Sequence, residues 1–174
     1  MNDRSPSRFR NPLTCKIAEF LTSVGIEVEP ARLDDGECFL PGIRVEGGRL
    51  LVDESGLTYP GDLLHEAGHL AVAPGDVRPG LSGEVFVPGA DMDALEAQAT
   101  AWAYAATVHL GLDPKILFHE GGYGGKSEGL LFTYGAGVYP GAHGLHQMGM
   151  TATLDAAREM GVAPYPNMLK WVRD

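Results

Sequence analysis

Cysteine is scarce in this sequence. Cys15 and Cys38 are the only two among 174 residues, and they do not form a C-x-x-C pair. Two thiols in a chain of this length exclude a disulfide-rich secreted scaffold, while a single disulfide between them stays open. Long apolar runs are also missing, which argues against a signal peptide and a membrane span. We therefore expect a cytoplasmic protein that does not engage a membrane.

Basic residues are few relative to acidic ones. Lysine and arginine number 13 against 23 aspartates and glutamates, so the formal net charge is −10. Binding to nucleic acid phosphates requires a basic patch, which argues against nucleic acid as the main partner, and solubility alone explains the acidic excess. The length and a hydrophobic content of 44% suit one globular domain. We expect this domain over residues 11–174, after a flexible tail over residues 1–10.

Local patterns predict an α+β protein. Apolar residues recur at helical spacing in several segments, and Gly47-Gly48 between two apolar arms is typical of a β-hairpin turn. Residues 120–149 are rich in glycine and suit a mobile lid or a set of tight turns. Helices are expected over 12–24, 60–73, 92–110, 113–119 and 151–160, and strands over 26–29, 38–45, 49–52, 84–87 and 130–134.

The most informative segment is 65–69, whose sequence HEAGH is an instance of the H-E-x-x-H pattern. Residues four apart lie on the same face of an α-helix, so His65 and His69 can direct two ring nitrogens at one zinc ion. Glu66 can lie beside the metal without binding it. There it can take a proton from a zinc-bound water, whose pKa the metal lowers to about 7. The pattern therefore predicts a zinc site with Glu66 as the general base.

The residues that flank this motif are apolar, which predicts that the helix is buried. Two histidines and a glutamate on a buried helix need partners, because burying polar groups without compensation is costly. A bound metal would meet that need. A core helix with hydrogen-bonded side chains and no metal would meet it as well, and this remains the alternative.

A catalytic zinc takes three protein ligands and keeps one position open. The metzincin pattern is excluded, because Val72 and Gly75 occupy the positions of its glycine and third histidine. Glu96 is the favoured third ligand, since it follows His69 by 27 residues on the next predicted helix. It lies on an alanine-lined face, which permits close approach of a neighbouring helix. The other candidates are His109, His119, Glu120, His143 and His146.

Residues 50–106 resemble the ImmA/IrrE-type zinc metallopeptidases, a gluzincin-like family of H-E-x-x-H enzymes. That family has a strand, then an H-E-x-G-H helix, then a helix with an E-x-x-A motif. The corresponding segments here are 50–53, 65–69 and 96–99. The resemblance covers about a third of the chain, and it implies His65, His69 and Glu96 as zinc ligands and Glu66 as the base.

Peptide hydrolysis also needs a hydrogen-bond donor for the developing oxyanion. His143 and His146 form an H-x-x-H pair in the glycine-rich segment, and they are predicted to contribute to catalysis if that segment folds over the site. A structural or solvent-exposed role is the alternative for each. The remaining candidates are His119, Tyr134 and Tyr139.

Together these patterns predict a single zincin-like α+β domain. A small β-sheet is expected to pack on the H-E-x-x-H helix and on a second helix that carries the third metal ligand. The expected function is that of a zinc-dependent hydrolase, specifically a metallopeptidase that cleaves a protein or peptide substrate. A competing hypothesis is a non-catalytic binding or regulatory protein that retains the zincin fold and the metal. A metal-free structural relative is the third.

Overall fold

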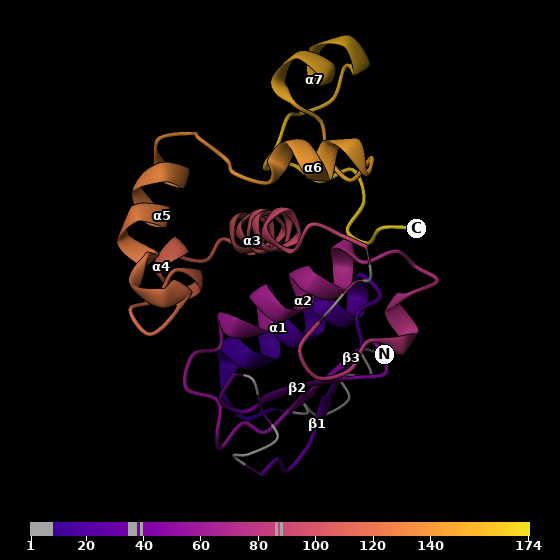
Figure 1. The fold of residues 1–174 in the computed structure, drawn as a ribbon. Coiled ribbons are helices and arrows are strands. Elements are labelled where there is room, and N and C mark those ends of the chain that lie inside the picture. Colours follow the sequence, from indigo (N-terminus) through magenta and orange to yellow (C-terminus); the bar gives the residue numbers. More distant parts are fainter. Residues whose placement is uncertain (1–8, 35–37, 39, 86, 88) are drawn as a thin grey trace, which may run out of the picture.

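The computed structural model describes residues 9–34, 38, 40–85, 87 and 89–174. In these residues the chain forms one α+β domain with seven α-helices and a three-stranded sheet (Figure 1). No helix among them is both long enough and apolar enough to cross a membrane. The α-helices are α1 (Pro12–Ser23), α2 (Asp62–Val72), α3 (Met92–His109), α4 (Pro114–Leu117), α5 (Ser127–Gly135), α6 (Ala142–Gln147) and α7 (Leu154–Met160); the 3-10 helices are η2 (Arg78–Gly80) and η3 (Tyr123–Gly125); the strands are β1 (Val28–Pro30), β2 (Ile43–Glu46) and β3 (Arg49–Val52).

The sheet is built around a tight hairpin. β2 pairs antiparallel with β3, and the connecting Gly47 and Gly48 have φ angles of +59° and +76°. Glycine adopts these angles without the steric cost that other residues pay. β1 pairs parallel with β3 on its other side, so the strand order is β1-β3-β2. The predicted hairpin is confirmed, although β2 begins at Ile43 and not at Cys38.

The helices stack in layers on this sheet. α1 and α2 cover the sheet, α3 lies on the far side of α2, α6 packs on α3, and α7 is the most distant from the sheet (Figure 1). Leu63, Leu64 and Leu70 of α2 and Trp102 of α3 are completely buried between these layers. The sheet was predicted to cover both metal helices, but α3 lies on the face of α2 opposite the sheet. The apolar residues on two sides of α2 explain this placement, because each side must be covered by a different element.

The contact between α2 and α3 is unusually close at Gly68. A Cβ atom at this position would lie 2.5 Å from the backbone oxygen of Ala99 and 3.1 Å from its Cα. Ala99 and Ala103 on α3 are fully buried and present only methyl groups at their positions. The small residues predicted to admit a neighbouring helix do admit α2. The glycine of HEAGH is therefore the point of close approach that brings both helix backbones together.

We expect Gly68→Ala to destabilise the domain by about 1–3 kcal/mol, because the added methyl group overpacks a backbone contact that cannot rotate away. Urea denaturation of the purified variant measures this effect. Gly129→Ala is the matched control, since a Cβ there meets no atom within 4 Å. That control should be neutral or slightly more stable than the wild type, because alanine has the higher helix propensity. Equal stability of the two variants would contradict the close-packing argument.

The segment that contains residues 171–174 closes the C-terminal end of α2. The Trp102 indole nitrogen donates to the Trp171 carbonyl at 2.7 Å, and the Arg173 amide donates to the Ala71 carbonyl at 2.9 Å. Arg78 donates to the carbonyls of Leu70 and Arg173 at 2.7 and 2.5 Å. The bonds to Leu70 and Ala71 satisfy carbonyls at the end of the helix that have no partner within it. Helix α2 is thus held at its end by residues distant in sequence.

Two predicted strands are wrong. Residues 130–134 were expected to be extended, but they belong to α5, where the Leu130 amide bonds to the Lys126 carbonyl. A short apolar run does not distinguish a strand from a turn or two of helix. In the predicted strand over 84–87, the described residues 84, 85 and 87 form no strand, and residue 86 lies outside the described residues. The glycine-rich region 120–149 also contains α6 and is more regular than a set of turns.

Residues 9 and 10 were predicted to belong to the flexible tail, but they pack on the domain. Phe9 is buried at 6% exposure, and the amides of Arg10 and Asn11 donate to the Glu54 carboxylate at 2.7–3.0 Å. Residues 9 and 10 therefore belong to the domain and not to the tail. The remainder of the predicted flexible tail, residues 1–8, lies outside the described residues.

Candidate metal centre

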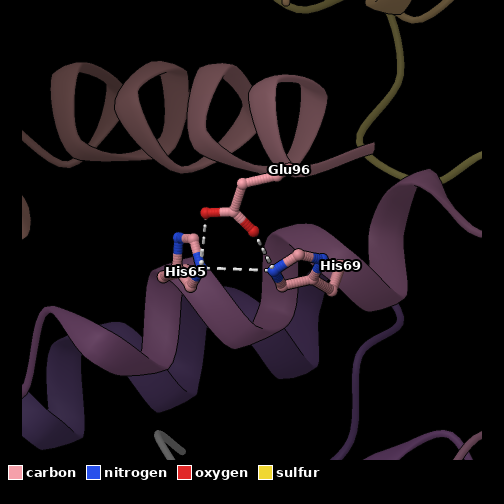
Figure 2. Close-up of side chains that lie close together, drawn as sticks. All are labelled: His65, His69 and Glu96. Atoms are coloured by element: carbon pink, nitrogen blue, oxygen red, sulfur yellow. Dashed lines mark hydrogen bonds and ion pairs between the residues drawn. The ribbon is translucent and has the colours of Figure 1, made fainter. Parts of the chain in front are cut away.

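Helix α2 places His65 and His69 one turn apart, and helix α3 brings Glu96 between them (Figure 2). The two histidine Nε2 atoms are 3.2 Å apart. The Glu96 carboxylate oxygens lie 3.4 Å from His65 Nε2 and 3.1 Å from His69 Nε2. Ligand atoms of these three residues all lie within 4.8 Å of one another. The structure therefore brings together the three side chains that the sequence predicted as metal ligands.

The spacing of these atoms fits a tetrahedral ion. Zinc binds histidine nitrogens and carboxylate oxygens at about 2.0–2.1 Å, so two ligand atoms at tetrahedral positions lie roughly 3.3 Å apart. The Nε2 atoms of His65 and His69, 3.2 Å apart, match that value, and Glu96 places one carboxylate oxygen near each of them, at 3.4 and 3.1 Å. Two imidazoles and one carboxylate are also a donor set that zinc prefers. His65, His69 and Glu96 can therefore hold a metal ion.

Burial and neighbouring charges shift the pKa values of His65 and Glu96 toward the protonation states that bind a cation. Burial lowers the pKa of His65 to about 4, with His69 lowering it further and Glu96 opposing both effects. His65 is therefore neutral near pH 7 and keeps a lone pair for a metal. The hydrogen bond from His69 lowers the pKa of Glu96, so Glu96 is ionised at the same pH.

Glu66 lies in the same cavity as the three ligands but makes no hydrogen bond or ion pair that the described residues supply. It is 7% exposed. Burial raises its pKa to about 7, while nearby His69 opposes the shift. A carboxyl group with a pKa near neutrality can both accept and release a proton at physiological pH. Glu66 therefore has the position and the acidity of a proton carrier.

The cavity has a volume of about 440 Å³ and opens on the triad. Glycines of the 121–124 loop form one wall, and apolar side chains form part of the rest. The charged side chains in the lining other than histidine are all acidic. The lining residues are Leu40, His65, Glu66, His69, Glu84, Val85, Met92, Glu96, Gly121, Gly122, Tyr123 and Gly124.

Tyr123 contacts the outer side of His65 and was absent from the sequence prediction. Its hydroxyl oxygen lies 3.3 Å from His65 Nδ1, and the two rings meet edge to face with centroids 5.3 Å apart. Burial raises the pKa of the Tyr123 hydroxyl, so it stays protonated. A single aromatic residue between two glycine pairs, Gly121-Gly122 and Gly124-Gly125, was the signal available in the sequence.

His119, Glu120 and His109 are not metal ligands in this arrangement. His119 Nε2 bonds to Asp62 Oδ1 at 2.7 Å, and its ring stacks on Tyr59 with centroids 3.7 Å apart. Burial raises the pKa of Asp62, against the effect of the hydrogen bond to His119. Glu120 lines a different cavity, which also contains Tyr59 and His119. His109 packs its ring against Phe20 and Trp171 near the end of α3.

The structure does not bring His143 and His146 to the triad. Both lie on α6, which packs on α3, and neither lines the cavity that contains the ligands. Their rings are 6.2 Å apart, and His146 Nδ1 lies 3.3 Å from the Thr151 carbonyl oxygen. Because α6 occupies the side of α3 remote from α2 (Figure 1), the part of the glycine-rich segment that carries this pair does not reach the site, whereas Gly121, Gly122 and Gly124 at the start of that segment line the cavity.

The tyrosines proposed as oxyanion donors also lie elsewhere. The Tyr134 hydroxyl donates to the Pro140 carbonyl at 2.8 Å, and Tyr139 packs against the rings of Tyr104, Tyr134 and Tyr165. Neither residue lines the cavity. Both serve the aromatic packing between α3, α5 and the segment that precedes α6.

Comparisons with protein-family models, curated proteins and solved structures found no match to this chain.

Proposed function

We propose that this chain is a zinc-dependent metallopeptidase with a zincin-like fold, in which His65, His69 and Glu96 hold the metal. The convergence of these three side chains, whose ligand atoms all lie within 4.8 Å of one another, in the same cavity as the carboxyl group of Glu66 is the observation that carries the proposal. The segment resemblance to ImmA/IrrE-type metallopeptidases points to the same four residues. The arrangement of α2 against α3 supports the zincin-like assignment, because the two helices supply all three ligands.

The chemistry divides between the metal and Glu66. When bound, zinc lowers the pKa of a coordinated water to about 7 and polarises a carbonyl group. Glu66 accepts a proton from the attacking water and passes it to the leaving amine. The buried position of Glu66 suits this exchange, because its pKa of about 7 allows both steps near neutral pH.

A peptide substrate fits the cavity better than a polyanion. The lining carries Glu66, Glu84 and Glu96 but no lysine or arginine. Carboxylates repel the phosphates of nucleotides and nucleic acids, which agrees with the net charge of −10. Apolar residues such as Val85 and Met92 offer contacts to substrate side chains. We expect a protein or peptide substrate and no membrane or nucleic acid partner. We expect the protein itself to be cytoplasmic.

We expect the purified protein to bind one zinc ion per chain and to cleave peptides in a zinc-dependent manner. Elemental analysis of protein purified without added metal gives the stoichiometry. A library of internally quenched peptides, including members with lysine or arginine beside the scissile bond because the lining is acidic, reports cleavage. Treatment with a zinc chelator should abolish cleavage, and added zinc should restore it.

The outcomes of this experiment separate the competing functions. One zinc per chain without cleavage of any peptide would favour the binding or regulatory protein that retains the metal. No zinc in the protein, even after zinc is added back, would favour the metal-free core helix. Cleavage that survives removal of zinc would contradict the proposed chemistry.

A further inference from the structure

We propose that Tyr123 is a positioning residue for the metal centre. Its hydroxyl oxygen accepts a hydrogen bond from His65 Nδ1 and so directs His65 Nε2 at the ion. This inference rests on the zinc site of the proposed function but not on peptide hydrolysis. It assigns the loop between α4 and α5 a task at His65, beyond forming one wall of the cavity. The segment concerned is 119–125, which we call the tyrosine loop.

The orientation of His65 requires a partner on the outer side of its ring. Its Nε2 atom faces His69 Nε2 and Glu96, at 3.2 and 3.4 Å (Figure 2). A neutral imidazole that gives its Nε2 lone pair to a metal carries its proton on Nδ1. The Tyr123 hydroxyl oxygen, 3.3 Å from Nδ1, is placed to accept that proton in a hydrogen bond. Metal-binding histidines are commonly oriented by such a bond on the second nitrogen, usually to a carboxylate or carbonyl group.

The backbone of Tyr123 adopts a conformation that bulky residues rarely take. Its φ angle is +54°, and it is the non-glycine residue with a positive φ among the described residues. Left-handed conformations are unusual for a side chain of this size, and they persist where the surrounding structure imposes them. Gly124 and Gly125, with φ angles of +58° and +79°, continue the left-handed turn. The chain accepts this conformation at the residue that reaches the metal ligand.

Contacts on both sides hold the tyrosine loop in place. The His119 ring bonds to Asp62 in the first turn of α2, which is the helix that carries His65. A Cβ on Gly122 would lie 3.0 Å from the His119 ring, so the loop lies directly against that ring. Ser127 Oγ, in the first turn of α5, lies 2.6 Å from the His119 carbonyl oxygen and 3.3 Å from that of Gly122. The loop is therefore fixed to α2 at its start and to α5 at its end.

Simple core packing is the competing explanation for Tyr123. Its ring does pack edge to face on Phe118, with centroids 5.2 Å apart. Packing requires the ring, however, whereas orientation of His65 requires the hydroxyl oxygen. Tyr123→Phe removes the hydroxyl and keeps the ring, so it separates the two explanations. Tyr134→Phe is the matched control, because it removes a buried tyrosine hydroxyl that bonds to the Pro140 carbonyl away from the metal centre.

We expect Tyr123→Phe to bind zinc roughly 10- to 100-fold more weakly than the wild type, the usual cost of losing such a partner. Competition against a chromophoric zinc chelator measures the dissociation constant, and Tyr134→Phe should leave it unchanged. In ¹⁵N NMR spectra of the zinc-loaded wild type, the His65 Nδ1 proton should exchange slowly with water. Tyr123→Phe should accelerate that exchange. Thermal melting of the zinc-free proteins reports folding separately.

A second variant tests the loop without changing the tyrosine. Gly122→Ala adds a methyl group that contacts the His119 ring, so it should displace the loop. We expect it to weaken zinc binding, as Tyr123→Phe does. Gly129→Ala is its control, because a Cβ there meets nothing within 4 Å. Wild-type zinc affinity and wild-type exchange of the His65 proton in Tyr123→Phe would overturn the inference. If zinc binding depends on Tyr123 but the protein cleaves no peptide, the proposed peptidase function is overturned and the role of Tyr123 stands. If the wild type binds no zinc, both proposals are overturned.

Discussion

Glu66→Gln is expected to reduce peptide cleavage by about 10²- to 10⁴-fold while the protein still binds one zinc ion, because general acid–base catalysis contributes this much. Glutamine has nearly the same shape as glutamate but cannot take a proton from the attacking water. Among the described residues, Glu66 forms no ion pair with the three ligands, so the metal site should persist. Steady-state cleavage of the best quenched peptide, together with elemental analysis of the same sample, checks both halves of the prediction.

The control for this variant is Glu159→Gln, which changes an exposed carboxylate on α7. It should retain the wild-type rate. A Glu66→Gln variant that cleaves as fast as the wild type would show that the proton moves through another group. A variant that loses its zinc as well would show that Glu66 supports the metal, and the rate alone would then not assign its role.

Glu96→Ala is expected to weaken zinc binding by more than roughly 10- to 100-fold. Loss of a residue that only orients a ligand costs that much, and this variant removes a metal ligand itself. Chelator competition measures the dissociation constant. The change also leaves His65 and His69 without the carboxylate that lies between them. Loss of zinc should be accompanied by loss of peptide cleavage.

Asp93→Ala is the matched control, since it removes an exposed carboxylate from the first turn of the same helix. It should bind zinc with wild-type affinity, apart from a small effect of helix stability. If Glu96→Ala binds zinc fully and with wild-type affinity, the third ligand lies elsewhere, and the proposed site of His65, His69 and Glu96 is wrong.

The parts of the site that follow from helical periodicity were predictable from the sequence. A spacing of four residues fixes His65 and His69 on one face of a helix, whatever the rest of the chain does. The alanines around Glu96 indicated a close helix neighbour, and the contact of Ala99 with Gly68 shows why they are small. Both observations are local, and each depends on a regular repeat of the backbone.

The parts that depend on the packing of distant segments were not predictable. Spacing places His143 and His146 on a common face but does not say which helix that face will meet, and α6 meets α3 on the side remote from the site. The run at 130–134 was short enough to suit either a strand or a helix, and it forms a helix whose Tyr134 packs on Tyr104 of α3. Tyr123 reaches His65 across 58 positions, a contact that no local pattern records.

The bonds between residues 171–173 and the end of α2 bear on how the domain folds. Arg78 and the Arg173 carbonyl are 95 positions apart, and the contact of Arg173 with the Val72 carbonyl spans 101 positions. Contacts of such long range are slow to form, because the intervening chain must first lose entropy. The HEAGH helix thus gains its last backbone partners only when most of the chain is in place. Zinc affinity should therefore report cooperative folding of the whole domain, and a fragment that contains α2 and α3 alone should capture the ion poorly.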